Sequence, residues 1–115
     1  MATYAMKLQE SAFERIKSGR KNIELRLFDE KRQGLNLGDS IEFSNVQDIN
    51  AKVHVKIIAL IRYPTFEELI AEFGMEYFCY PKWYSLEKYL PSIYTIYSQE
   101  DEKKYGVLGI KLQLL

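Results

Sequence analysis

The 115-residue sequence lacks several features that would indicate a particular class of protein. A single cysteine, Cys79, excludes an internal disulfide and a cysteine-based metal site. A single histidine, His54, leaves little for a histidine-rich zinc site. No window has the apolar length that spans a bilayer, and no apolar run follows basic residues at the start, as in a signal peptide. We therefore expect a soluble, cytoplasmic protein with no metal, no cofactor and no membrane partner.

The chain also lacks a net charge, because 16 basic side chains balance 16 acidic ones. A generally basic nucleic-acid binder is therefore not indicated, and any such function must depend on a local patch. Hydrophobic residues make up 47% of the chain and aromatic residues 14%, which is enough to fill a core. The length fits one domain, so residues 1–115 are expected to fold as a single unit.

The hydrophobic pattern predicts short strands and short helices in mixed order. Since the strands are neither strictly hairpin-linked nor strictly alternating with helices, we expect an α+β domain built on a curved, barrel-like sheet. Strands are expected over residues 3–8, 22–27, 40–45, 51–63 and 106–115, and helices over 10–19 and 65–73, around Pro91, and after Ser98.

Two of these elements have well-defined patterns. The helix over 65–73 has Thr65 as its N-cap, Glu68 three residues later and Gly74 as its C-cap, with an apolar stripe of Phe66, Leu69, Ile70 and Phe73. In the longest strand, alternation puts one set of side chains on a single face, namely Val53, Val55, Ile57 and Ile61.

The stretch SGRKNIELRL, residues 18–27, brings charges close together on a strand. Glu24 and Arg26 share the face opposite Ile23 and Leu25, and Lys21 lies at the corner before the strand. One interpretation is an ordinary solvated face. The other is a cleft covered by the helix over 65–73 and the aromatic segment after it. In that cleft the bases would hold a phosphate or carboxylate and the acid would bind a base amide.

Four residues of this stretch, Gly19, Lys21, Glu24 and Arg26, match the pattern G-x-K-x-x-E-x-R. Together with GDSIEF and the ending EDEKKYGVLGIKL, the pattern resembles the ASCH domain (activating signal cointegrator homology), a branch of the PUA-like superfamily. The resemblance runs from about Met6 to the C-terminus. It implies a small β-barrel of about five to six mixed strands with helices packed around it. It also implies a cleft, lined by the motif residues, that binds RNA or a nucleotide.

A second function follows from a small bacterial group of ASCH proteins that hydrolyse acetylcytidine-type nucleosides with a lysine, a threonine and a downstream glutamate. The lysine matches Lys21, whereas the threonine falls on Glu24 and the glutamate falls near Gly74, with Glu76 close by. The alternative is therefore a hydrolase of an acylated nucleoside or RNA in which Lys21, with a depressed pKa, and Glu24 are catalytic.

Other residues have weaker patterns. Tyr105 precedes the last strand and is expected at the cleft mouth, among the ligand-binding residues. His54 lies on a small basic strand face, Cys79 is expected to be buried, and the charged run after Ser98 is expected to be a solvated helical turn. The aromatic segment after Gly74 is expected to fill the core or to form a lid that stacks bases; its members are Tyr77, Phe78, Tyr80, Trp83 and Tyr84.

Overall fold

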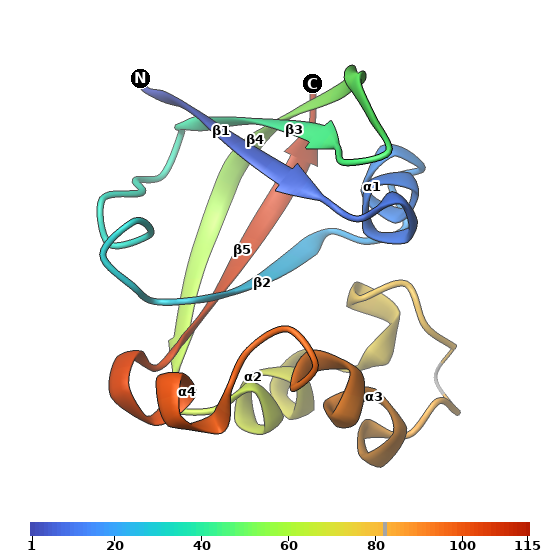
Figure 1. Ribbon diagram of the computed structural model, residues 1–115, viewed down its shortest axis with the longest axis vertical. Helices are drawn as coiled ribbons and strands as arrows, with labels where there is room; N and C mark the ends of the chain where they lie inside the picture. The colour runs from blue at the N-terminus through green and yellow to red at the C-terminus, as the bar shows by residue number, and fades with distance from the viewer. Residues whose placement is uncertain (82) are drawn as a thin grey trace.

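A mixed sheet of five strands, curled into a half-barrel, is the framework of the domain (Figure 1). The computed structural model describes residues 1–81 and 83–115. The strands are β1 (Thr3–Leu8), β2 (Ile23–Leu27), β3 (Ser40–Asn45), β4 (Asp48–Tyr63) and β5 (Val107–Leu114). The helices are α1 (Glu10–Lys17), α2 (Phe66–Phe73), the 3-10 turn η1 (Met75–Tyr77), α3 (Leu86–Ile93) and α4 (Gln99–Tyr105). The expected α+β, barrel-like class is confirmed.

The strand order is β1-β3-β4-β5-β2, with β1 and β3 parallel and the other pairs antiparallel. β1 and β2 are therefore the two edges of the sheet. Because the sheet curls, these edges approach each other across an opening, and α1 connects them in sequence (Figure 1). The lower half of the molecule in this view is made by α2, α3 and α4.

Two apolar cores lie on the two faces of β5. Leu108, Ile110 and Leu112 face the inside of the half-barrel, where they join Phe13, Ile41, Phe43, Val55 and Ile57. Val107 faces the helical half, where it joins Ile23, Leu25, Phe66, Leu69 and Phe78. A Cβ at Gly109, on the helical face, would lie 3.1 Å from Leu69 Cδ1, so the glycine lets α2 pack closely on the sheet.

One prediction about β4 is wrong because the strand contains a bulge. The register with β5 shifts between Ile57 and Ala59, and Ile58 is left 44% exposed. Beyond the bulge, Leu60 takes the place inside the half-barrel, whereas Ile61 packs with the second core instead of sharing a face with Val53.

The charged run in α4 also differs from the expectation, because Glu102 is buried. Its carboxylate accepts a hydrogen bond of 2.8 Å from the backbone N–H of Phe66, the first residue of α2. The single O–H of Tyr94 also donates to it and is shared between the two carboxylate oxygens, each 2.9 Å away. Burial and this carboxylate raise the pKa of Tyr94 to about 12. The caps predicted at Thr65 and Ser98 are confirmed, since each hydroxyl accepts from a backbone N–H three residues on.

None of the helices in the described ranges 1–81 and 83–115 is both long and apolar enough to cross a bilayer.

Replacing Glu102 tests whether its carboxylate stabilises the contact between α4 and the start of α2. Glu102→Ala should lower the free energy of unfolding by about 2–4 kcal/mol, because a buried N–H and a hydroxyl lose their acceptor. Glu102→Gln should cost less, since the amide oxygen still accepts, and Glu100→Ala on the exposed side should cost under about 1 kcal/mol. Urea unfolding curves measure all three, and equal effects of Glu102→Ala and Glu100→Ala would contradict this role.

Candidate functional site

A buried carboxylate held between two cations forms the centre of the site. Lys21 Nζ lies 3.1 Å from Glu24 Oε1, and Arg26 Nη2 lies 2.9 Å from Glu24 Oε2. Arg26 Nε donates a second hydrogen bond of 3.0 Å to the same Oε2. Glu24 is only 4% exposed and Lys21 only 9%. The three side chains, called the triad below, are therefore a desolvated ion cluster and not a solvated strand face.

The backbone fixes each member of the triad. Glu24 and Arg26 lie opposite Ile110 and Leu108 of β5, so both point toward the inside of the half-barrel. Lys21 precedes β2 and is held by a hydrogen bond of 3.0 Å from its N–H to Arg15 O and by a bridge to Phe78. Gly19, with φ of +80°, reverses the chain between α1 and this bridge, a conformation that disfavours side chains.

In the cleft interpretation the charged face is covered by α2 and the aromatic segment; Tyr80 of that segment does line the cavity, but α2 does not. The apolar stripe of α2 buries Phe66, Leu69 and Ile70 against the opposite face of β2, where Ile23 and Leu25 lie. The physical reason is that an apolar stripe gains more from burial against an apolar face than against a charged one. The charged face is instead opposed by the end of β1, by α1 and by the segment from α3 to Tyr97.

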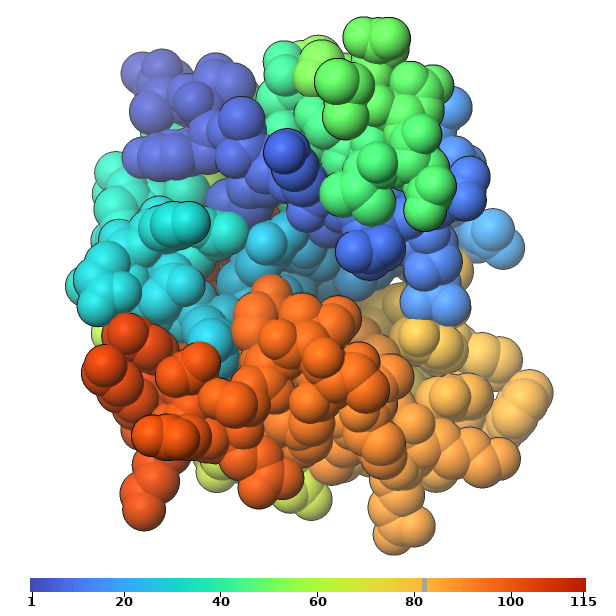
Figure 2. Space-filling model, in the orientation of Figure 1, coloured from blue at the N-terminus to red at the C-terminus, as the bar shows by residue number. Residues whose placement is uncertain are grey.

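A cavity of about 550 Å³ opens in front of the triad. It lies where the half-barrel is open, between β1 and β2, and its walls are completed by α1 and α3. Figure 2 shows the corresponding furrow between β1 (dark blue) and the segment from α3 to Tyr97 (orange), with β2 (lighter blue) at its base. Four basic side chains and one acidic side chain contribute to its lining, namely Lys7, Arg15, Lys21, Arg26 and Glu24.

Arg26 also links the two edges of the open sheet. Its Nη2 donates a hydrogen bond of 3.3 Å to the backbone oxygen of Lys7 in β1. One guanidinium thus binds the carboxylate of Glu24 and satisfies a carbonyl of an unpaired strand edge. The geometry of the cavity therefore depends on the position of Arg26.

The charges in the triad support one another electrostatically. Burial alone raises the pKa of Glu24, but the attraction of Lys21 and Arg26 outweighs burial, so the pKa lies below its ordinary value of 4.5. Burial likewise lowers the pKa of Arg26, and the neighbouring Glu24 carboxylate reverses that effect, so the net direction is upward. Glu24 is thus held ionised in the folded protein.

Aromatic side chains form the other wall of the cavity, with Tyr80, Tyr89 and Tyr97 in its lining. Arg15 Nη1 donates a hydrogen bond of 2.7 Å to the Tyr80 hydroxyl, and the guanidinium carbon lies 4.6 Å from the Tyr80 ring centroid. Burial raises the pKa of Tyr89 and of Tyr97. Tyr80 belongs to the segment expected as a lid, whereas Arg15, Tyr89 and Tyr97 were not anticipated. No local pattern separates Arg15 from the other basic residues of its helix.

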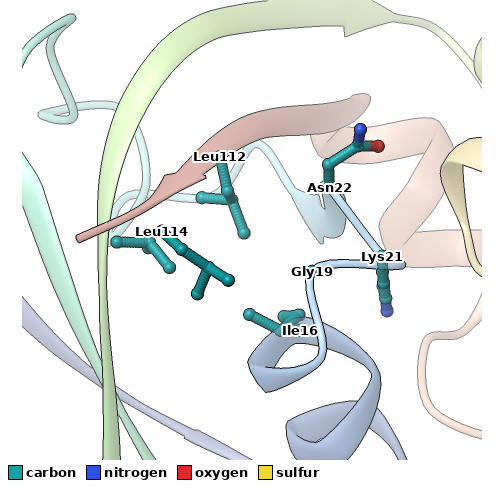
Figure 3. A pocket seen from close by; sticks show the side chains of 7 residues that line it. Ile16, Gly19, Lys21, Asn22, Leu112 and Leu114 are labelled. Carbon is teal, nitrogen blue, oxygen red and sulfur yellow. The ribbon is translucent and has the colours of Figure 1, made fainter.

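Two predicted ligand-binding residues lie apart from the triad cavity. Gly19 lines a smaller cavity of about 190 Å³ on the other side of Lys21, with Ile16, Leu112 and Leu114 (Figure 3). Tyr105, at the end of α4, packs at the edge of the second core, with Lys104 Nζ 5.0 Å from its ring centroid.

Cys79 and His54 differ in their surroundings. Cys79 is half-buried instead of buried and has a φ of +68°. The His54 ring is exposed and lies 3.0 Å from Glu42 Oε2, while Lys52 Nζ lies 3.4 Å from Glu42 Oε1. Within residues 1–81 and 83–115, no three potential metal ligands come together.

Two three-residue ion clusters within residues 1–81 and 83–115 offer a matched comparison of burial. Glu24→Ala should lower the free energy of unfolding by about 3–5 kcal/mol, because Lys21 and Arg26 are left desolvated without a counter-charge. Glu42→Ala, in the exposed cluster with Lys52 and His54, should cost under about 1 kcal/mol, and Glu30→Ala in the exposed loop should be neutral. Chemical denaturation measures the difference, and three equal values would show that the triad is effectively solvated.

The pKa of Glu24 predicts a pH dependence with a definite sign. Because this pKa is lower in the folded than in the unfolded chain, the stabilisation is present above pH 4.5 and is lost as the pH falls through the folded value. The free energy of unfolding of the wild type should therefore fall more steeply than that of Glu24→Gln from about pH 5 to about pH 3. Unfolding curves at several pH values check this, and parallel slopes would contradict it.

Comparison with known proteins identifies the fold family. The ASCH domain family model matches residues 6–115. The crystal structure of the hypothetical protein PH0355 superimposes with a TM-score of 0.85 at 35% identity, over 98% of this chain and 99% of that chain. The solution structure of PF0455 from Pyrococcus furiosus superimposes with a TM-score of 0.77 at 35% identity, over 98% of this chain and 97% of that chain.

A more distant structure shows the same fold. ASCH from Zymomonas mobilis superimposes with a TM-score of 0.65 at 16% identity, over 96% of this chain and 66% of that chain. No functionally curated protein matches the sequence. The match of the family model over nearly the whole chain, on a fold shared with these structures, shows that the protein belongs to the ASCH domain family.

Proposed function

We propose that this ASCH domain binds RNA or a nucleotide in the cavity between β1 and β2, with Lys21, Glu24 and Arg26 as the principal contacts. The observation that carries the proposal is the triad itself: two cations and an anion, nearly excluded from water, in the wall of a cavity large enough for a nucleotide. ASCH domains are generally thought to bind RNA, which agrees with this chemistry.

The triad keeps hydrogen-bonding capacity for a ligand after its internal ion pairs are formed. The Lys21 ammonium carries three donors and the Arg26 guanidinium five, more than their contacts with Glu24 use. These donors suit a phosphate or a base carbonyl. Glu24 Oε1, which contacts Lys21, still has accepting capacity for an amino or imino group of a base or for a ribose hydroxyl, whereas Oε2 is occupied by Arg26 Nε and Nη2.

The surroundings of the triad favour an anionic ligand over a neutral one. Arg15 and Lys7 add two positive charges to the lining, so the cavity is basic although the whole chain carries no net charge. Because few phosphates can reach this small patch, the logarithm of affinity should fall with the logarithm of salt concentration with a slope of only about one to three.

Binding should depend on Arg26 far more than on a basic residue outside the cavity. Arg26→Ala should weaken binding of a short single-stranded RNA by about ten-fold to one-hundred-fold, because a charge-assisted hydrogen bond is lost. Arg62→Ala is the matched control, since Arg62 lies over the Phe28 ring and is not in the cavity lining. Fluorescence anisotropy at two salt concentrations measures both, with thermal melts to confirm folding.

Lys7→Ala gives a second variant if Arg26→Ala is too unstable, because the Lys7 side chain is exposed at the cavity rim. It should lower affinity modestly and reduce the salt slope by about one. Absence of binding to RNA or nucleotides even at low salt would contradict the proposed function.

A second candidate function is hydrolysis of an acylated nucleoside or RNA. The observation that favours it is the contact of Lys21 with Glu24 beside a nucleotide-sized cavity. Glu76, the nearest candidate for the downstream glutamate, is exposed and is not in the cavity lining. Turnover of acylated nucleosides that disappears in Lys21→Ala would support a hydrolase, and turnover untouched by that change would remove it.

A further inference from the structure

A continuous row of aromatic rings runs from the cavity wall to the surface. Tyr89, which is buried, lies 4.8 Å from Tyr80 between ring centroids. Tyr80 stacks on Tyr84 at 4.7 Å with an interplanar angle of 25°, and Tyr84 lies 6.4 Å from Trp83. The row, called the aromatic ladder below, begins in the lining of the cavity and ends at Trp83.

The outer end of the ladder is exposed to an unusual degree. Trp83 is 78% exposed, whereas every other aromatic side chain in the described part of the chain is buried or half-buried. Tryptophan ordinarily buries most of its large ring. The indole, tilted by 50° to the Tyr84 ring at the end of this row, is therefore available to stack on a planar group of a ligand.

The Tyr80 ring, within the aromatic ladder, is fixed by its neighbours. The Tyr80 ring contacts Tyr84, Tyr89 and the Arg15 guanidinium, so its neighbours already surround it. Cys79, directly before it, has a left-handed φ of +68°, a conformation that costs energy in a side-chain-bearing residue and reverses the chain there. Free stacking surface is thus found at Trp83 and not at Tyr80.

The cavity mouth also carries exposed apolar side chains. Ile96, 70% exposed, and Val46, 38% exposed, are both large apolar side chains in the cavity lining. A ligand that leaves the cavity therefore meets apolar surface as well as basic side chains. Nucleobases combine flat apolar faces with a charged backbone, and aromatic side chains stack them with little regard to sequence.

We propose that Trp83 and Tyr84 form a second base-stacking subsite, so that the ligand is a single strand of several nucleotides with one in the cavity and the next along the aromatic ladder. This inference rests on the proposed function and specifies its ligand. A duplex does not fit the subsite, because its bases are already stacked on one another. Continuity with the basic cavity favours a nucleic-acid strand over a protein as the occupant of this surface.

Trp83 is the only tryptophan of the chain, so its fluorescence reports directly on the subsite. Titration with a single-stranded tetranucleotide of alternating A and C should quench it, whereas adenosine monophosphate should bind in the cavity with little quenching. Anisotropy of the labelled tetranucleotide should show at least about a five-fold loss of affinity in Trp83→Ala, the loss of one stacked base. Affinity for adenosine monophosphate should be unchanged in this variant.

Two controls separate stacking from a general change of the surface. Trp83→Phe should recover most of the affinity, because a smaller aromatic ring still stacks. Ile49→Ala, which changes another exposed apolar residue, 63% exposed and outside the cavity lining, should have no effect. A stable RNA hairpin that holds the same sequence base-paired in its stem should show no dependence on Trp83.

The outcomes distinguish this inference from the proposed function. If the tetranucleotide binds, Arg26→Ala weakens it and Trp83→Ala does not, then the cavity is the nucleotide site and the second subsite is wrong. If neither the tetranucleotide nor adenosine monophosphate binds the wild type, the proposed function fails and the subsite with it.

Discussion

The placement of one carboxylate between two cations in a nearly dry environment constrains the rest of this domain. Glu24 is stable as an anion there only while Lys21 and Arg26 stay within about hydrogen-bonding distance, because a buried unpaired charge is costly. That requirement fixes the register of β2 against β5 and the turn at Gly19. It also fixes the guanidinium that reaches across to the edge of β1. The opening of the half-barrel is therefore a built cavity, held by charge pairing where strand pairing is absent.

The two faces of β2 have different surroundings. One face carries Ile23 and Leu25 into the helical core, and the other carries Glu24 and Arg26 into the cavity. A shift of one residue in register would bury the charges under α2 and expose the apolar side chains. Two features of the sheet stabilise this arrangement. Gly109 lets α2 approach the sheet closely, and the bulge at Ile58 turns Ile61 toward the helical core. The proposed ligand site and the helical core thus share the same strand.

Local patterns in the sequence were sufficient for the strands, the helix caps and the charged motif, because alternation and capping act over a few residues. They were insufficient wherever the outcome depended on distant partners. Glu102 looks like any residue of a solvated helix, yet it is buried because Phe66 N–H and Tyr94 need an acceptor. Arg15 belongs to the cavity only because α1 lies beside Tyr80. The choice of face for α2 and the opening between β1 and β2 likewise follow from how the whole sheet curls.

Arg26, within the buried triad, is the proposed main contact of the ligand. The most direct test is the nitrogen-15 NMR signal of the Arg26 Nε–H group during titration with a short single-stranded RNA. Because this N–H donates to Glu24 beside the cavity, we expect a saturable shift at Arg26 that follows the binding curve. Arg62, outside the cavity lining, should show none. Binding that leaves the Arg26 signal unmoved while other residues shift would show that Arg26 does not contact the ligand.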